Sequence, residues 1–373
     1  MSGKFLKAVV AGFAVWAICG TWVGSNAAEP PALARLSGAE KERAVKLIEG
    51  AKKEGELVAY SASWHPDVQE KMIPLFRNEY GLSESDLKIK IVSTRTSAIV
   101  TKTTEELRAK VYRIDIVQTA PAFWFDELIA RGEIMAYDCP EYKNYSPLVA
   151  DPRFGAANPP YYITAQITPT GLTYNPKYVK GEILHWKDVL RPEYEGKIVC
   201  GDISASYSLV EAYLSLCKVV GKFFFEELGK RKPFLTTSVT DRLNKCISGE
   251  FPVCLLSTHI VFRSNQKGAG LKIVFPQEGW PVTGYPTAIL SHAPHPNASK
   301  LFMDFFHGAP CQDLMLNYAG LPVGRFGVTS KYPDFPKPIY EMKGAIEMDW
   351  RKVTKRDREE AREESRRLLK GGR

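Results

Sequence analysis

Short apolar stretches of strand length alternate with amphipathic helical stretches along the first third of the chain, and this alternation limits the fold more than any other feature. Strands are expected at residues 57–60, 88–93 and 114–118, and a helical pattern follows each of them after a few polar residues. Successive strand–helix units of this kind form a largely parallel sheet whose two faces are covered by helices. The sequence therefore predicts an α/β protein.

Three other stretches carry local signals. Ser37 and Glu40 have the spacing of a capping box at the start of a helix that ends at Gly55. Residues 169–171, Pro-Thr-Gly, predict a turn between two strands, because proline and glycine are turn residues. From Tyr340 onward the chain is helical in pattern and heavily charged, which is typical of a helix face turned to solvent.

The charge of the chain is mildly basic and unevenly spread. There are 50 Lys and Arg against 42 Asp and Glu, a formal net charge of +8 over 373 residues. Residues 351–373 hold ten basic and five acidic side chains, so most of the excess lies in the C-terminal tail. The nearly neutral remainder argues against a nucleic-acid-binding groove, and the length predicts about two domains, each with its own core.

Residues 1–28 have the pattern of a secretory signal peptide. Two lysines precede an uncharged apolar run from Ala8 to Val23, and small residues suit cleavage near Ala27. The run is short for a membrane-spanning helix and contains glycines, so cleavage is preferred to an uncleaved anchor. The mature protein is therefore expected to be exported.

Sequence motifs of common enzymes and metal sites are missing. The chain contains no GxSxG, HExxH, GxGxxG or P-loop pattern and no CxxC pair. Six cysteines follow the signal segment, and those in apolar strand-like runs, Cys200 and Cys254, are interpreted as buried thiols. We expect no enzyme activity, no cofactor and no resident metal.

Small hydroxylated residues stand where each early strand gives way to a helix. They are Ser61 and Ser63 after the first strand, Thr94 and Ser97 after the second, and Thr119 after the third. Such side chains often only cap the following helix. In open α/β sheets, however, ligands bind at this carboxyl edge, where helix N-termini offer free N–H groups. Three hydroxyl-bearing loops in register favour a shared binding cleft.

Several segments, in their order and spacing, resemble the periplasmic solute-binding proteins of ABC transporters, in the type II class that includes the ferric-iron-binding proteins. The segments are Lys53–Tyr60, Thr170–Val179, Trp186–Leu190, Pro192–Ile198 and Ala293–Ala298 with Leu301 and Phe302. The likeness extends from about Lys53 to Trp350. It implies a type II periplasmic-binding fold, in which two α/β lobes, each a mixed sheet flanked by helices, are joined by hinge strands and close around a ligand.

The resemblance also implies the lobe boundaries and the partners. Lobe one is placed at 29–160 with 283–325, and lobe two at 161–282 with 326–373. The protein would act in the periplasm as a monomer and deliver a small-molecule ligand to an inner-membrane ABC permease, with no nucleic-acid partner. A periplasmic ligand sensor that docks on a receptor kinase, and a secreted enzyme, are alternatives that the sequence leaves open.

Iron-binding members of the class hold their metal with a histidine in the first strand–helix loop, a carboxylate and two adjacent tyrosines. His65 lies near the first of these positions. The tyrosine pair would follow residues 253–258, where this chain has His259 instead, and the loop at Thr119 brings no carboxylate. Because ferric iron prefers anionic oxygen ligands, a ferric-iron carrier is the alternative and not the main prediction.

The cleft is therefore expected to hold a small organic or oxyanionic solute. Arg95 at a helix start combines a fixed positive charge with nearby N–H donors, which suits a carboxylate, phosphate or phosphonate. Trp64 is either a cleft wall or a packed core aromatic, and Tyr285 lies at a return crossover between the lobes. The predicted ligand-binding residues are Ser61, Ser63, Trp64, His65, Thr94, Arg95, Ser97, Thr119, Ser204, Ser206, Tyr207, Thr258, His259 and Tyr285.

Overall fold

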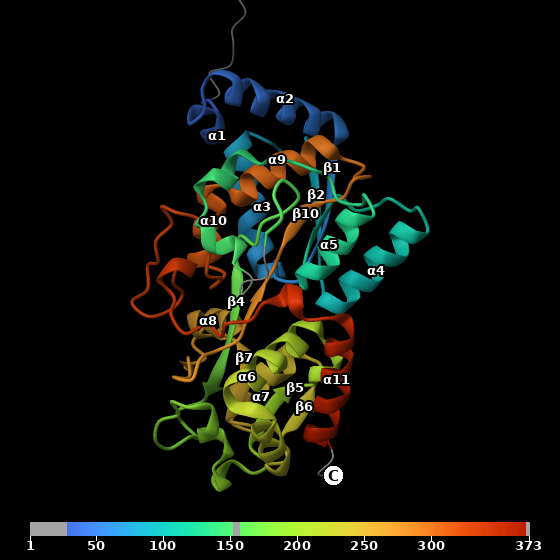
Figure 1. Ribbon diagram of the computed structural model, residues 1–373. Coiled ribbons are helices and arrows are strands. Elements are labelled where there is room, and N and C mark those ends of the chain that lie inside the picture. The colour runs from blue at the N-terminus through green and yellow to red at the C-terminus, as the bar shows by residue number, and fades with distance from the viewer. Residues whose placement is uncertain (1–27, 152–156, 371–373) are drawn as a thin grey trace, which may run out of the picture.

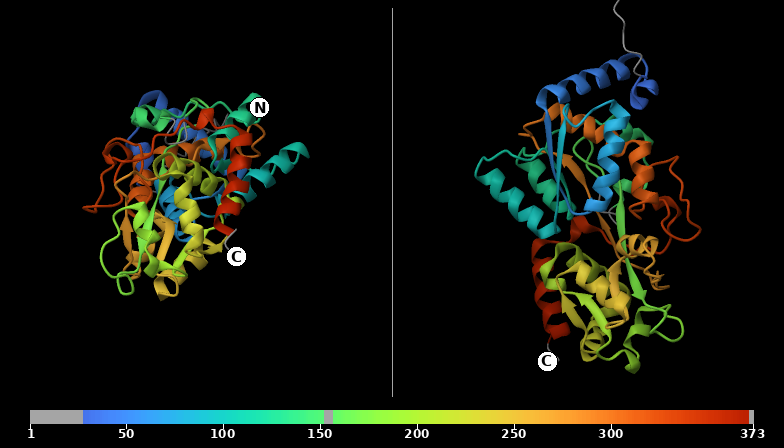
Figure 2. Two further views of the ribbon diagram at one scale, coloured as in Figure 1. Left: turned by 60° about the horizontal axis from the view of Figure 1, so that its bottom comes forward. Right: turned by 180° about the vertical axis from the view of Figure 1, so that it is seen from behind.

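The computed structural model describes residues 28–151 and 157–370, and it divides into two lobes stacked one above the other (Figure 1). The upper lobe in that view contains a four-stranded sheet and the lower lobe a six-stranded sheet. The view from behind in Figure 2 shows the same division, with the long strand β4 (Ile167–Tyr174) running between the lobes. The predicted two-lobed α/β fold is confirmed. The expected signal segment and its cleavage site fall on residues outside the described part.

The sheet of the upper lobe is formed by β1 (Glu56–Ser61), β2 (Lys88–Ser93), β3 (Ile116–Gln118) and β10 (Thr287–Ile289). Its order is β10–β3–β1–β2. The three early strands are parallel, and Ser61 at the end of β1 lies opposite Ser93 of β2 and Gln118 of β3. Their carboxyl ends therefore meet at one edge of the sheet.

The sheet of the lower lobe combines β4 with five shorter strands. These are β5 (Ile198–Gly201), β6 (Phe234–Thr236), β7 (Val253–Ser257), β8 (Lys272–Val274) and β9 (Val282–Gly284). The order is β6–β5–β7–β4–β8, with β9 paired to the first half of β4. β5 is parallel to β6 and β7, whereas β4 is antiparallel to β7, β8 and β9. The sequence does not predict β6 or β9, because strands of three residues show little periodicity.

β4 is one continuous strand where the sequence predicts a turn. Pro169 pairs with Val282 of β9, and Gly171 pairs with Leu256 of β7. A Cβ on Gly171 would lie 2.5 Å from the carbonyl oxygen of Val274. Glycine at position 171 therefore lets the backbone of the neighbouring strand come close, and close backbone approach, like a turn, is a common reason for glycine.

Three chain passes connect the lobes, the last of them between Val328 in the core of the upper lobe and Ile339 in the core of the lower lobe. Just before β4, Ile163 bridges Thr287 of β10 in the upper sheet, and β4 then enters the lower sheet. The chain returns through β9, which is paired to β4, and reaches β10 three residues later. Domain hinges are built from a few residues at such element ends.

Helices cover both faces of the upper sheet. They are α1 (Pro31–Ala34), α2 (Gly38–Glu54), α3 (Pro66–Tyr80), α4 (Thr96–Arg108), α5 (Ala122–Ala130), α9 (Pro296–His307) and α10 (Ala309–Asn317). α2 ends as predicted at Gly55, whose φ of 71° is the left-handed conformation that favours glycine. The predicted capping box is wrong, because the Ser37 side chain makes no capping hydrogen bond to α2.

Aromatic side chains dominate the core of the upper lobe. Trp64, Phe76, Phe302 and Phe306 are fully buried, and the Trp64 ring centroid lies 5.5 Å from that of Phe302 and 4.9 Å from that of Phe306. Aromatic pairs at this spacing add to the stabilisation that their buried area provides. Because Trp64 directly follows the loop after β1, the cluster also fixes that loop.

The lower lobe is covered by α6 (Tyr207–Lys230), α7 (Val239–Ser248), α8 (Thr258–Gln266) and α11 (Lys355–Lys370). α6 is interrupted at Gly221, where φ is 70°. Short 3₁₀ turns lie at 140–144, 147–150, 186–190, 192–194, 203–205, 339–341 and 350–352. None of the helices in the described ranges is both long and apolar enough to cross a bilayer.

The C-terminal helix α11 is not the wholly solvated tail that its charge predicts. It begins at Lys355, and its residues Arg358, Ala361 and Leu369 are buried in a stripe against α6. Gly229 of α6 permits this contact, since a Cβ there would clash with the backbone of α11. Figure 2 shows α11 lying along the lower lobe with one end next to the helices of the upper lobe.

Candidate ligand-binding site

The carboxyl edges of the two sheets face each other across the space between the lobes. In the upper lobe α3, α4 and α5 begin at this edge, after β1, β2 and β3. In the lower lobe α6 and α8 begin after β5 and β7, and ring contacts join them to the upper lobe. Helix N-termini carry unpaired N–H groups and partial positive charge, so this space suits a polar or anionic ligand.

The predicted site residues Ser61 and Ser63 are buried, and their hydroxyl groups are used by the protein itself. Ser61 Oγ donates to Oε1 of Gln118 at 2.6 Å and accepts from the Trp64 N–H at 2.8 Å. Ser63 Oγ accepts hydrogen bonds from Nε2 of Gln118 and of Gln166, each at 2.7 Å. The two serines therefore shape the loop after β1 and join it to the segment that enters β4.

Three further predicted residues are also enclosed. Trp64 is fully buried in the aromatic core, so it is not a wall of the space between the lobes. Thr119 Oγ1 donates to the Ala120 carbonyl at 3.2 Å, and Thr258 Oγ1 donates to the Pro169 carbonyl at 3.1 Å. Both threonines are fully buried, and these local bonds satisfy their hydroxyl groups.

His65 and His259 bring the lobes into contact. His65 precedes α3 of the upper lobe, and His259 lies in the first turn of α8 of the lower lobe. Their rings stack with centroids 5.9 Å apart and an interplanar angle of 23°. Beside them, Nε of Arg263 in α8 lies 3.3 Å from Oδ2 of Asp67 in α3. We call these four residues the histidine contact.

Both imidazoles of the histidine contact are held neutral. Burial, together with the guanidinium of Arg263, lowers the pKa of His65 to about 4, while Asp67 opposes the shift. Burial, Arg263 and His65 lower the pKa of His259 well below its ordinary value. Nδ1 of His259 and Nη1 of Arg263 have no hydrogen-bond partner among the described residues. Nor do three His, Cys, Asp or Glu side chains gather as a metal site anywhere in those residues.

The loop after β2 is open to solvent. Thr94 and Arg95 are exposed, and Ser97 is half-buried in the first turn of α4. The side chain of Arg95 forms no ion pair or hydrogen bond with the part of the chain that the structure covers. Its guanidinium is therefore available to an anion.

A cavity of about 350 Å³ lies between the lobes next to α11. α4 and α5 line it from the upper lobe, and α6 and α11 line it from the lower lobe. Figure 1 shows these four helices gathered on the side of β4 away from α8. The predicted site residue Tyr207 is part of the lining. The charged side chains of the lining are Glu105, Glu127, Glu359, Arg108, Lys355, Arg358 and Arg362.

Four side chains connect the walls of this interlobe cavity. Phe123 of α5 packs edge to face against Tyr207 of α6, with ring centroids 6.3 Å apart. The guanidinium carbon of Arg358 lies 4.2 Å from the Phe123 ring centroid, and that of Arg362 lies 4.5 Å from the Tyr207 ring centroid. Guanidinium groups at this distance over a ring are attracted to it, most strongly when desolvated. We call these four residues the arginine–aromatic contact.

Arg358 is also half of a buried ion pair. Its Nη2 lies 3.6 Å from Oε1 of Glu211 in α6, and both residues are buried. Burial raises the pKa of Glu211 to about 7, although Arg358 opposes the shift. The carboxyl group therefore carries only part of a negative charge at neutral pH. Nε and Nη2 of Arg358 lack a hydrogen-bond partner within 28–151 and 157–370.

The remaining predicted residues lie at the edge of the lower sheet. Ser204 Oγ donates to Oδ1 of Asp202 at 2.6 Å, and the hydroxyls of Ser206 and Ser208 share a hydrogen bond of 3.0 Å. Tyr285, between β9 and β10, is buried, and burial raises its pKa to about 12. Its hydroxyl group therefore stays protonated and can act as a hydrogen-bond donor.

The sequence model of the bacterial extracellular solute-binding proteins matches residues 114–340, more than half of the chain. The chain belongs to this family. No curated protein matches it.

Solved structures share the fold of this solute-binding protein. Iron-bound HitA from Pseudomonas aeruginosa has a TM-score of 0.64 at 18% identity, over 85% of this chain and 99% of its own. AfuA from Actinobacillus pleuropneumoniae, with fructose-6-phosphate bound, has a TM-score of 0.65 at 18% identity, over 85% of this chain and 97% of its own. The substrate binding protein of an ABC transporter from Agrobacterium tumefaciens has a TM-score of 0.67 at 14% identity, over 86% and 96%. At these identities the likeness shows the fold alone.

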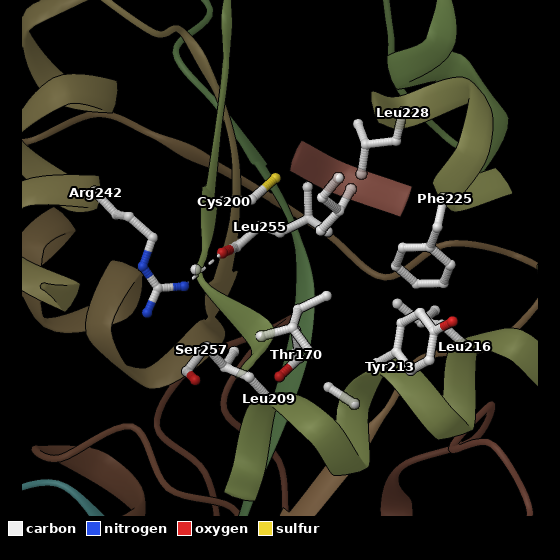
Figure 3. Close-up of a pocket in the computed structure, with 14 residues that line it drawn as sticks. Thr170, Cys200, Leu209, Tyr213, Leu216, Phe225, Leu228, Arg242, Leu255 and Ser257 are labelled. Atoms are coloured by element: carbon white, nitrogen blue, oxygen red, sulfur yellow. Dashed lines mark hydrogen bonds between the residues drawn. The ribbon is translucent and has the colours of Figure 1, made fainter. Parts of the chain in front are cut away.

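A second, smaller cavity lies inside the lower lobe of the solute-binding protein (Figure 3). It measures about 40 Å³, and apolar side chains such as Leu216 and Phe225 line most of it. Arg242 stands at one end, where its Nη1 donates to the Leu255 carbonyl at 3.1 Å. A volume of this size holds a few water molecules, and its lining comes from one lobe, so this cavity is not part of the interlobe space.

Sequence reasoning missed four residues at the interlobe cavity of the solute-binding protein. Phe123 lies in the helix start after β3, at the same sheet edge as the predicted residues, so its position carried a signal. Glu211 is an acidic residue within the apolar helix α6, which is also a signal. No sequence signal marks Arg358 and Arg362, because their neighbours depend on where α11 packs.

Proposed function

We propose that this solute-binding protein is the periplasmic receptor of an ABC importer, which captures a small organic or oxyanionic solute between its lobes and delivers it to an inner-membrane permease. The observation that carries the proposal is that both lobes line the interlobe cavity, where the arginine–aromatic contact joins them, and that they meet a second time at the histidine contact. A ligand that touches both lobes favours the closed arrangement, so capture shifts an open–closed equilibrium. In this role the protein does no chemistry on the solute.

The charge distribution supports an anionic solute over ferric iron. Arg95 is exposed and free of partners among the residues described, and four basic side chains face three glutamates in the interlobe cavity. At the histidine contact, by contrast, two neutral imidazoles lie beside the cation of Arg263. Ferric iron prefers anionic oxygen ligands, and a neighbouring guanidinium repels it. Among proteins of this fold, HitA is described with iron and AfuA with fructose-6-phosphate, an organic phosphate.

The experiment that tests the proposal identifies the solute that the protein carries. Protein purified without denaturation is weighed by native mass spectrometry, and the released molecule is identified by small-molecule mass spectrometry. We expect an organic or oxyanionic solute. Ferric iron with a visible charge-transfer band would instead support the iron carrier, and chemical turnover of the solute would support an enzyme.

A second measurement tests the closing motion. Small-angle X-ray scattering of the protein stripped of its solute and then reloaded should show a smaller radius of gyration after loading. An unchanged radius would count against capture between moving lobes. Genes for a permease and an ATPase beside this one would favour the importer over a sensor that docks on a receptor kinase.

A further inference from the structure

We propose that the C-terminal helix α11 provides the seat for the anionic group of the solute, with Arg358 and Arg362 together holding a carboxylate or phosphoryl group in the interlobe cavity. This inference rests on the proposed function, because it names where that same space holds its ligand. α11 lies beyond residues 114–340, the part that the family sequence model matches. The seat would therefore lie on a part of the chain that the family sequence model does not describe.

The spacing of the two arginines is the first support. Arg358 and Arg362 are four residues apart on α11, and both line the interlobe cavity. Residues at this spacing stand one above the other on the same helix face, and like charges placed there repel each other. An oxyanion between the two guanidinium groups would turn this repulsion into attraction.

The orientation of the guanidinium groups is the second support. Each lies over an aromatic ring, Arg358 over Phe123 and Arg362 over Tyr207. Stacking occupies the flat face of a guanidinium, while its N–H donors point outward in its plane. Contact with a ring uses no N–H donor, so the donors other than Nη1 of Arg358, which bonds to the Val353 and Thr354 carbonyl groups, stay available to ligand oxygens.

The third support is that the positive charge of Arg358 is poorly compensated. The residue is 2% exposed, yet Nε and Nη2 have no hydrogen-bond partner among the residues that the structure describes. Nη1 donates to the carbonyl groups of Val353 and Thr354, and Glu211 is near only through Nη2 at 3.6 Å. Buried cations are normally both paired and hydrogen-bonded, so Nε and Nη2 of Arg358 are two buried donors that an oxyanion could satisfy.

Acidic residues of the cavity do not supply that anion. Glu359 is exposed on α11 and lies 3.9 Å from Nζ of Lys355. Glu105 and Glu127 belong to α4 and α5 in the opposite wall and form no ion pair with Arg358 or Arg362 in the described ranges. Arg362 itself has no carboxylate partner there. An oxyanion that enters the cavity would be a counter-charge that both arginines share, whereas Glu211 pairs with Arg358 alone.

Calorimetric titration of defined anions into the full mature protein tests the inference. The probes are inorganic phosphate, glycerol 3-phosphate and glutarate at constant ionic strength. They compare a phosphoryl group with and without an organic part, and a phosphoryl group with a carboxylate. The main variant is Arg362→Gln, since Arg362 is half-buried and its loss should not disturb folding. Arg358→Gln is the second variant. Arg356→Gln is the matched control, because Arg356 is exposed on the same helix and pairs with Glu360.

We expect the wild type to bind at least one of the three anions and Arg362→Gln to bind it at least about tenfold more weakly, because charge-assisted hydrogen bonds are lost. Arg356→Gln should stay within about twofold of the wild type. Equal affinity of Arg362→Gln and wild type would overturn the inference, and so would a loss confined to Arg95→Ala.

The two proposals fail in different ways. If no anionic probe binds but the purified protein carries a neutral or cationic solute, the seat on α11 is refuted and solute capture survives. If no solute is carried and none of a wider panel binds, the proposed function itself fails. Circular dichroism and melting temperature equal to those of the wild type ensure that a weakened variant is a folded one.

Discussion

Replacing His65 by asparagine should remove a pH dependence of stability that the histidine contact creates. His65 is enclosed beside Arg263, and its pKa is about 4 against 6.5 for an ordinary imidazole. When the pKa of a histidine is lower in the folded protein than in the unfolded chain, the unfolded chain binds the proton more tightly. Above pH 6.5 the group is neutral in both states and costs nothing. As the pH falls from 6.5 towards 4, the folded protein loses stability.

The size of the effect follows from the two pKa values. The full difference between 6.5 and about 4 corresponds to about 3.4 kcal/mol, which is reached only below pH 4. Between pH 7.5 and 5.5, protonation of the unfolded chain accounts for about 1.3 kcal/mol of this loss. Glu211 acts in the opposite direction over the same range, because its pKa of about 7 lets the folded protein bind a proton first. The wild type alone therefore does not isolate the histidine.

The assay compares wild type and His65→Asn by urea unfolding, followed by far-UV circular dichroism, at pH 7.5, 6.5 and 5.5. Glu211 and the other groups titrate in both proteins, so their contributions cancel in the difference. The stability of the wild type relative to the variant should fall by about 1.3 kcal/mol from pH 7.5 to 5.5. A difference that stays constant within about 0.3 kcal/mol would refute the reasoning.

Three more substitutions have defined expectations. Phe302→Ala should lower the free energy of unfolding by about 3–5 kcal/mol in the same urea assay, because it opens a cavity in the aromatic core. The control Phe326→Ala should change it by less than about 0.5 kcal/mol, since Phe326 is 51% exposed. Glu211→Gln should abolish a loss of about 1.4 kcal/mol that the wild type suffers between pH 6 and 8.5, because a carboxyl group with a raised pKa destabilises the fold as it ionises; equal pH profiles in urea would contradict this. Arg95→Ala should leave the melting temperature within about 2 °C, since the side chain is exposed, and should weaken the binding of an anionic solute; unchanged affinity in calorimetry would remove Arg95 from the site.

The upper sheet could be predicted almost strand by strand from the sequence. β2 has its predicted bounds, and β1 extends one residue beyond its prediction at each end. Local pattern suffices there because apolar residues recur along each strand and glycines follow α2 and α3 at their C-caps. β4 shows the limit of local pattern. The role of Gly171 depends on Val274, which approaches from a strand about a hundred residues later in the chain.

The sequence predicts where residues of the candidate site lie along the sheet edges, but it does not predict which side chains contact each other. His65 and His259 each follow a strand end, so their place at the sheet edges was predictable. Their stacking depends on how the lobes meet, which no local pattern encodes. For the same reason the sequence does not reveal that Gln118 and Gln166 occupy the hydroxyl of Ser63.

The proposed anion seat and the proposed lobe closure would be linked, because the arginine–aromatic contact spans the lobes. Phe123 belongs to the upper lobe, whereas Tyr207, Arg358 and Arg362 belong to the lower one. When the lobes meet, Arg358 is stacked on Phe123 and shut away from water, with only a partly charged Glu211 beside it. Removing a cation from water is unfavourable unless its charge is well compensated, so we expect the empty protein to be biased towards an open arrangement. An oxyanion on the proposed seat would add that compensation only where the cavity is formed. Its binding would then favour closure in proportion to its preference for the closed site over the open one.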